Sequence, residues 1–249
     1  SKERIYKKIL SKFPEGCKRI LLIKPFPFNV EYFELNQAKN KRYYTWPPYG
    51  VGVLCSALKS RGYEVEIIDF NFEVLSMINN SEELKDDKSA QRKVDNFWKK
   101  TLETVIKDFN PDLVGLTCMF TMGHDQLIRT ADFIRKNHKD LPIIVGGVHI
   151  TNAPDFVLNA SNSIDFAGLY ESDVSFCDFI DIINEKTQKN KLNQIASIIQ
   201  DDYVCIEERV PPTEEELNIT PDYNDLDIGQ YGLLGEIGSY RPWLPQMPK

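Results

Sequence analysis

The stretch Val145-Gly146-Gly147-Val148-His149 decides the fold of this sequence, together with one stretch on either side of it. Upstream lies Val114-Gly115-Leu116-Thr117-Cys118, and downstream lies Phe166-Ala167-Gly168-Leu169-Tyr170-Glu171. Each is a short apolar run, typical of a buried parallel strand, that ends in small or hydroxyl-bearing residues. Ligands of open parallel sheets bind at the carboxyl ends of the strands. Three such ends without bulky side chains predict a large ligand that lies across this edge and partly enters the core.

Strand and helix patterns alternate five times along the chain. Short apolar runs predict strands at 20–23, 65–68, 113–116, 143–145 and 166–169. Amphipathic or capped segments predict helices at 51–58, 98–109, 127–134, 154–160 and 176–183. Repeated units of this kind form a doubly wound α/β fold with right-handed crossovers. We therefore expect a flavodoxin-like (Rossmann-like) five-stranded parallel sheet with strand order 2-1-3-4-5.

The character of the chain changes near residue 188. Ile195–Ile199 and Tyr203–Ile206 flank a short polar turn and predict a hairpin. The last stretch, 240–249, holds three prolines and shows neither a helical nor a strand period. We expect residues 1–188 to form the α/β domain, and residues 189–249 to form the hairpin and an extended linker toward another domain.

Composition excludes several classes of protein. A net charge of −7 argues against nucleic-acid binding, which needs clustered Lys and Arg. No apolar run approaches the ~18 to 20 residues of a membrane-spanning helix and no signal peptide opens the chain, so we expect no membrane contact and a cytoplasmic location. The five cysteines are widely spaced and form no C-x-x-C motif, which argues against a thiolate metal site and a disulfide framework. Cys55, Cys118 and Cys177 are interpreted as small buried hydrophobes.

A nucleotide site of the usual kinds is disfavoured. The loop after the first predicted strand reads Lys24-Pro25-Phe26-Pro27-Phe28-Asn29, and proline lacks the N–H group that a phosphate-binding loop uses. What remains is an edge built from glycine, hydroxyl and aromatic groups. Gly146 and Gly147 could serve a tight turn, and Thr117 could cap a helix. Their conjunction with Gly168 at adjacent strand ends favours an occupied crevice.

These features resemble, in order and spacing, the cobalamin-binding domain at the N-terminus of many radical S-adenosylmethionine enzymes. The resemblance covers nearly the whole chain. Its motifs are Pro47-Pro48-Tyr49-Gly50, Gly62-Tyr63-Glu64-Val65 before Asp69, Pro111-Asp112-Leu113-Val114-Gly115, Gly146-Gly147-Val148-His149, the turn from Gly168 to Glu171, and Pro221-Asp222-Tyr223. No single motif is diagnostic, and the specificity lies in their order and spacing together.

The resemblance implies a cofactor and the residues that hold it. The corrin ring of cobalamin would lie over the carboxyl edge of the sheet. Its nucleotide tail would be buried beside the third and fourth strands, with the lower base displaced from cobalt (base-off). The family pattern implies cofactor contacts from Tyr49, Gly50, Thr117, Met119, Phe120, Thr121, Met122, Gly146, Gly147, His149, Gly168, Tyr170 and Glu171. A bulky residue at position 147 is then expected to abolish binding and to leave the fold intact.

The resemblance also implies a larger parent enzyme. Its most common activity is methyl transfer, with a 4Fe–4S cluster and S-adenosylmethionine held in a downstream radical domain of the same polypeptide. The C-x-x-x-C-x-x-C motif of that domain is missing here, so we expect no catalytic residue and no radical chemistry in this chain. The chain is then an excised N-terminal portion or a stand-alone binding module. Neither the substrate nor the reaction of the parent enzyme is readable from these residues.

Two alternatives stay open at this point. Many cobalamin domains carry Asp-x-His-x-x-Gly after the first strand, whose imidazole ligates cobalt, and this chain lacks that triplet. His124 could ligate cobalt from the lower face, but Gly123-His124-Asp125 also reads as a helix start, which we favour, and we assign no metal ligand. The rival function is a cobalamin-free interaction module, in which the aromatic residues between positions 43 and 49 pack against a partner.

Overall fold

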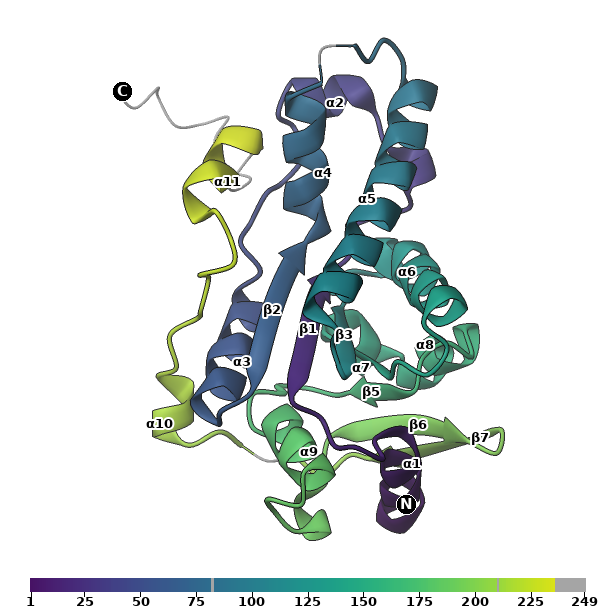
Figure 1. Cartoon of the computed structure of the whole chain (residues 1–249), viewed down its shortest axis with the longest axis vertical. Coiled ribbons are helices and arrows are strands. Elements are labelled where there is room, and N and C mark those ends of the chain that lie inside the picture. The colour runs from purple at the N-terminus through teal and green to yellow at the C-terminus, as the bar shows by residue number, and fades with distance from the viewer. Residues whose placement is uncertain (82, 210, 236–249) are drawn as a thin grey trace.

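The computed structural model describes residues 1–81, 83–209 and 211–235. Its centre is a seven-stranded sheet in the order β2-β1-β3-β4-β5-β6-β7 (Figure 1). The five parallel strands are β1 (Arg19–Lys24), β2 (Glu64–Asp69), β3 (Leu113–Thr117), β4 (Ile143–Gly146) and β5 (Phe166–Gly168). The predicted doubly wound α/β fold and the strand order 2-1-3-4-5 are confirmed.

The five predicted parallel strands are present, but the sheet has seven strands and not five, because the hairpin joins it. β6 (Ile195–Ile199) runs antiparallel to β5, and β7 (Asp202–Ile206) runs antiparallel to β6. Without the hairpin, the N–H and C=O groups of β5 would form an open edge, which folded proteins avoid. The hairpin, which follows the predicted boundary at residue 188, is therefore continuous with the sheet of the α/β domain.

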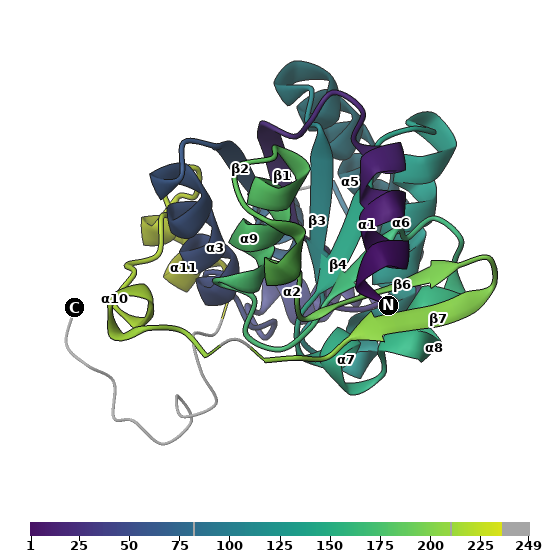
Figure 2. The same cartoon turned by 90° about the horizontal axis from the view of Figure 1, so that it is seen from below.

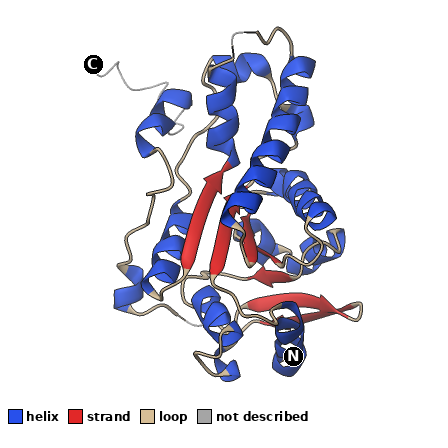
Figure 3. Cartoon of the chain, viewed as in Figure 1, coloured by secondary structure: helices blue, strands red, loops and turns tan. Residues whose placement is uncertain are grey.

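Helices cover both faces of the sheet and divide the core into two clusters. On one face lie α1 (Lys2–Lys12), α3 (Tyr49–Ser60) and α9 (Ser175–Ile183), which Figure 2 shows on the same side. On the other face lie α4 (Phe70–Asn79), α5 (Asp87–Phe109), α6 (His124–Asn137), α7 (Val148–Asn152) and α8 (Pro154–Ala160). The helices thus enclose the strands (Figure 3). The short elements are η1 (Val30–Tyr32), α2 (Leu35–Lys39), η2 (Thr121–Gly123), η3 (Lys189–Lys191), α10 (Glu214–Leu217) and α11 (Ile228–Leu234).

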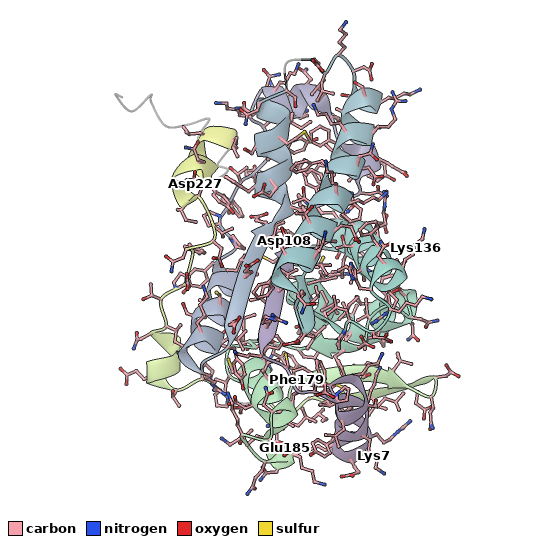
Figure 4. All side chains as sticks on the ribbon, viewed as in Figure 1. Lys7, Asp108, Lys136, Phe179, Glu185 and Asp227 are labelled. Atoms are coloured by element: carbon pink, nitrogen blue, oxygen red, sulfur yellow. The ribbon has the colours of Figure 1, made fainter. Side chains whose placement is uncertain are left out.

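Side chains separate by polarity as these layers require. Phe179 of α9 is 2% exposed and lies in the interior, whereas Lys7, Lys136 and Glu185 point away from it (Figure 4). The expected burial of Cys55, Cys118 and Cys177 is confirmed, and all five cysteines are free. Burial raises the pKa of the Cys118 thiol to about 11. Within the described ranges, no group of three or more His, Cys, Asp or Glu side chains is arranged to hold a metal ion. No helix in those ranges has the length and apolar character needed to cross a membrane.

The sequence patterns do not predict α1 or α4. Asp69 ends β2 and caps α4 directly, since its Oδ1 accepts hydrogen bonds from the N–H groups of Asn71 (2.9 Å) and Phe72 (3.4 Å). α4 packs between β1, α5 and α11, and it buries Phe70, Asn71, Phe72, Val74, Leu75 and Ile78. A helix that is covered on so many sides lacks a polar face, so its apolar residues show no clear period.

Residues 220–234 pack back onto the domain. Tyr231 of α11 is 1% exposed, its hydroxyl donates to Asp69 Oδ2 (3.1 Å), and its ring stacks on Phe72 with centroids 4.5 Å apart. Lys24 Nζ donates to the same Asp69 oxygen (2.9 Å). The predicted linker is therefore tied to the ends of β1 and β2 as far as α11. The proline-containing stretch 240–249 lies outside the described residues.

Gly52 of α3 makes room for the same C-terminal segment. A Cβ at this position would lie 2.6 Å from Tyr223 Cε1 and 2.9 Å from Pro221 Cβ. The Asp222 N–H donates to the Gly52 oxygen (3.0 Å), and Lys59 Nζ donates to the Asp222 carboxylate (2.9 Å). The segment thus sits in a slot on α3 that only a glycine leaves open.

Gly52→Ala should loosen the C-terminal segment. Alanine normally favours a helix over glycine by about 1 kcal/mol, but here its methyl group would overlap Tyr223 and Pro221. We expect a net loss of stability and faster proteolysis after residue 219, measured by urea denaturation and limited proteolysis. Gly50→Ala is the matched control, because a Cβ on Gly50 meets no heavy atom within 4 Å. An equal response of the two variants would contradict the packing.

Candidate functional site

The carboxyl ends of β3, β4 and β5 meet at one edge of the sheet. Thr117 pairs with Gly146 across β3 and β4, and Val145 pairs with Ala167 across β4 and β5. A Cβ on Gly146 would have the carbonyl oxygen of Gly168 as its nearest neighbour, at 3.8 Å. The three stretches with small residues are therefore adjacent in space, and Gly146 leaves room beside them.

Gly147 has a different role from Gly146. Its φ of 109° and ψ of 173° form a conformation that is essentially restricted to glycine, and a Cβ there would lie 2.5 Å from the Cys118 oxygen. The Cys118 N–H donates to the Gly146 oxygen (2.9 Å), and the His149 N–H donates to the Cys118 oxygen (3.2 Å). Gly147 is thus required where the loops after β3 and β4 touch. The expectation that a bulky residue at position 147 leaves the fold intact is wrong.

Five large apolar side chains near these loops are exposed. They are Met119, Phe120, Met122, Val148 and Phe156, with exposed fractions from 54% (Val148) to 63% (Met122). We call this set the apolar edge. The sequence does not single out Phe156, which α8 brings to within 4.8 Å of the His124 ring. Exposed apolar groups at the edge of a sheet are typical of surfaces that bind a ligand or a partner.

Two histidines form a hydrogen-bonded pair at the apolar edge. His149 Nε2 lies 3.0 Å from His124 Nδ1, and Thr121 Oγ1 lies 3.4 Å from His149 Nδ1. His149 is 5% exposed, and its pKa is lowered first by burial and then by the nearby His124. The neutral His149 ring therefore ties α7 to the start of α6. His124 is the first residue of α6, in agreement with its interpretation as a helix start.

A small cavity lies between the sheet and α9. Its volume is about 10 Å³, close to the room that one water molecule needs. The polar and small residues that line it are Gly168, Ser172, Ser175, Asn193 and Gln194. A Cβ on Gly168 would lie 3.5 Å from Ser172 Oγ, an ordinary contact distance. The rest of the lining is apolar and comes from Ile144, Phe176, Phe179 and Ile195. The cavity is therefore a narrow seam with a largely apolar lining beside the end of β5.

The turn after β5 is held by three separate segments. Tyr170 adopts a left-handed conformation (φ 59°), and its N–H donates to Thr151 Oγ1 of α7 (2.8 Å). Gln194 Nε2 donates to the Glu171 oxygen (2.8 Å). The guanidinium carbon of Arg209 lies 3.9 Å from the centre of the Tyr170 ring. Arg209 is a contact that the sequence patterns do not reveal, because it follows β7 and is distant along the chain.

Tyr49 and Gly50 lie apart from these groups in the sheet order. They open α3 after β1, and β3 separates β1 from β4 and β5. Tyr49 is 65% exposed, and the rings of Tyr44 and Trp46, which are in tilted contact (centroids 5.5 Å apart), are 49% and 46% exposed. These three aromatic residues form a second exposed apolar set, which we call the aromatic loop.

The model of the B12 binding domain family matches residues 38–180, more than half of the chain. This chain therefore belongs to the B12 binding domain family. The matched range contains the ends of β3, β4 and β5, the apolar edge and the histidine pair.

Curated relatives extend well beyond the matched region. The chain is 26% identical over 167 residues to cytidylyl-2-hydroxyethylphosphonate methyltransferase of Streptomyces wedmorensis, covering 66% of this chain and 30% of that protein. It is 26% identical over 190 residues to anaerobic magnesium-protoporphyrin IX monomethyl ester cyclase of Rubrivivax gelatinosus, covering 75% and 30%. The chain thus spans about 30% of the length of these relatives.

A solved structure shares the fold. The cobalamin-dependent S-adenosylmethionine radical enzyme OxsB, with aqua-cobalamin and S-adenosylmethionine bound, superposes with a TM-score of 0.59 at 17% sequence identity. The match covers 88% of this chain and 26% of that chain. At this identity the similarity establishes the architecture, and the residues of the site come from the geometry described above.

Gly147→Ala should destabilise the protein, because the new methyl group would meet the Cys118 backbone in a strained conformation. The expected loss is about 1–3 kcal/mol of the free energy of unfolding. Gly146→Ala is the matched control, since its Cβ has ordinary space, and it should cost less than about 1 kcal/mol. Urea denaturation measures both values. Equal losses in the two variants would contradict the role assigned to Gly147.

His149 should make the protein less stable in acid. Its folded-state pKa lies below the ordinary value of 6.5, so the unfolded chain takes up this proton first as the pH falls. The contribution of neutral His149 is complete above about pH 6.5 and is lost as the pH falls through the folded-state pKa. His149→Gln should therefore lose less free energy of unfolding than wild type between about pH 7.5 and 5.5. Identical pH profiles of the two proteins would refute this assignment.

Proposed function

We propose that this chain binds cobalamin, with the corrin ring over the apolar edge and the nucleotide tail directed behind Gly168 toward the cavity beside α9. The observation that carries the proposal is the conjunction of the exposed apolar edge with the small residues Gly146 and Gly168 at adjacent strand ends. Membership of the B12 binding domain family supports it. A corrin macrocycle is broad and largely apolar, and it would cover side chains that are otherwise in water.

The residues at this edge fit the two parts of such a ligand. Met119, Phe120 and Met122 supply flexible and aromatic contact surface for a flat ring. The seam beside α9 has a mixed lining: its apolar side chains would contact the nucleotide base, and the hydroxyl and amide groups of Ser172, Ser175, Asn193 and Gln194 would contact polar parts of the tail. The seam is about 10 Å³, so a buried nucleotide base requires α9 to move away from β5. The ion pair between Arg61 and Asp178 (2.9 Å) is one of the contacts that hold α9 in place.

Bound cobalamin would supply a cobalt–carbon bond that can deliver an alkyl group. In the proposal the lower base is displaced from cobalt, and the protein residues position the ring and exclude water from its lower side. Thr117 and the backbone at Gly146 would contact the start of the tail. His149 would hold the loop that carries the apolar edge, and His124 would remain bound to His149.

We further propose that this domain serves a larger radical S-adenosylmethionine enzyme. The longer relatives support this reading: one is a methyltransferase and one is a cyclase. The 4Fe–4S cluster and S-adenosylmethionine would belong to a separate domain, which would meet this chain at the carboxyl edge of the sheet. Methyl transfer is the activity we favour.

The competing function is a cobalamin-free interaction module. The observation that favours it is the aromatic loop, where Tyr44, Trp46 and Tyr49 are exposed on the β1 side of the edge. In that case the apolar edge and the aromatic loop would form one docking surface for a partner domain. Titration with cobalamin separates the two functions.

The purified chain should bind hydroxocobalamin saturably, with a shift of its visible absorption bands. Gly146→Val should weaken binding by about tenfold or more, since the loss of ~1.4 kcal/mol of contact suffices, while circular dichroism and urea denaturation show a retained fold. His138→Ala is the control, because His138 ends α6 beside Pro142 at the opposite edge of the sheet. If a folded chain shows no saturable binding, the interaction module is the better reading.

The base-off state has its own readout in the same samples. Reduced, cobalt(II) cobalamin should show no nitrogen splitting from a lower ligand in its electron paramagnetic resonance spectrum when the base is displaced. A nitrogen splitting that disappears in His124→Ala would assign His124 as the cobalt ligand. A splitting that persists in that variant would show that the lower base stays on cobalt.

A further inference from the structure

Arg209 lies at the carboxyl edge of the sheet because the hairpin returns the chain to that edge. β6 runs antiparallel to β5, and β7 runs antiparallel to β6, so β7 points in the same direction as β5. The register places Gly168, Ile195 and Ile206 in one row across the three strands. The residues after Ile206 therefore emerge beside the carboxyl end of β5. Arg209, which is exposed, lies over the Tyr170 ring at 3.9 Å.

We propose that Arg209 binds the phosphodiester of the cobalamin nucleotide loop, an inference that rests on the proposed function. In cobalamin the phosphodiester lies between the corrin ring and the nucleotide base and carries one negative charge. With the ring over the apolar edge and the tail directed behind Gly168, this group must cross the rim of the sheet at the end of β5. Tyr170 and Arg209 occupy that rim.

The Tyr170 ring holds the Arg209 guanidinium in an orientation that allows its N–H groups to bind an anion. A guanidinium group that lies on a ring face keeps its N–H donors in its own plane, where they are free to meet two oxygens of a phosphate. The Tyr170 backbone is itself fixed by Thr151 Oγ1, which accepts its N–H (2.8 Å). The cation is thus positioned before a ligand arrives, which lowers the entropic cost of binding.

The surrounding charges make this cation necessary. The chain has a net charge of −7, and Glu171 and Glu207 are exposed near the same rim. Lys24, at the end of β1, is engaged by Asp69 and by the Trp46 oxygen. An anion at the end of β5 would therefore meet repulsion from acidic groups, and Arg209 supplies the compensating positive charge.

A comparison of cobalamin with cobinamide tests the assignment. Cobinamide keeps the corrin ring and lacks the phosphate, the ribose and the base. We expect Arg209→Gln to weaken cobalamin binding about tenfold, the range of a hydrogen bond to a charged group, and to change cobinamide binding less than about twofold. The salt dependence of cobalamin binding should also become shallower in this variant, because one charge contact is lost.

Two further variants control the comparison. Arg4→Gln removes an arginine that pairs with Asp202 (2.9 Å) at the far end of the hairpin, and it should leave both ligands unaffected. Tyr170→Leu removes the ring and keeps Arg209. It should also weaken cobalamin binding more than cobinamide binding, by a smaller factor than Arg209→Gln does.

The titrations with cobalamin and cobinamide separate the phosphate contact of Arg209 from cobalamin binding by the chain as a whole. If Arg209→Gln loses cobalamin and cobinamide affinity equally, or loses neither, the phosphate contact is overturned. Saturable cobalamin binding by wild type would in both cases still support the proposed function. If wild type binds neither ligand, the proposed function fails and the contact fails with it. Dissociation constants from visible titrations of the folded chain and its variants decide among these results.

Discussion

The contact between two backbone segments at Gly147 is the constraint on which the apolar edge depends. The loop after β4 can approach the Cys118 backbone only where no Cβ intervenes, and the φ of 109° at Gly147 meets that condition. Hydrogen bonds between Cys118, Gly146 and His149 then close the two loops into one unit. The apolar edge and the histidine pair both depend on this unit, because Met119, Val148, His124 and His149 all flank it along the chain.

Glycines in this protein do two physically different things. Gly146 and Gly168 have neighbours at ordinary contact distance, so they leave room beside the strand ends. Gly147 and Gly52 have neighbours inside 3 Å of a Cβ position, so they permit close approach of other parts of the chain. A side chain at either of the first two positions meets neighbours at ordinary contact distance, whereas a side chain at either of the second two forces other parts of the chain to move.

Residues 195–209 and 220–234 pack around the carboxyl edge of the sheet. The hairpin reverses direction twice, covers the short strand β5 and brings Arg209 to Tyr170. The following segment crosses α3 at Gly52 and inserts Tyr231 beside Asp69, at the carboxyl end of β2. Both contacts place residues from the C-terminal quarter of the chain at the edge where the parallel strands end. The same edge of the sheet therefore holds the C-terminal segment and the candidate site.

Local patterns in the sequence determined the five parallel strands, the hairpin and the small residues at three strand ends, because strand and helix periods are set by neighbouring residues. The order 2-1-3-4-5 was predicted from the fold class that such alternating units form. The tertiary structure alone decided that the hairpin extends the sheet to seven strands and that α4 lies buried on many sides. It alone paired His124 with His149, and it brought Phe156 and Arg209 to the site. These contacts join residues far apart in sequence. The local periodicity of a segment does not determine which distant side chain packs against it.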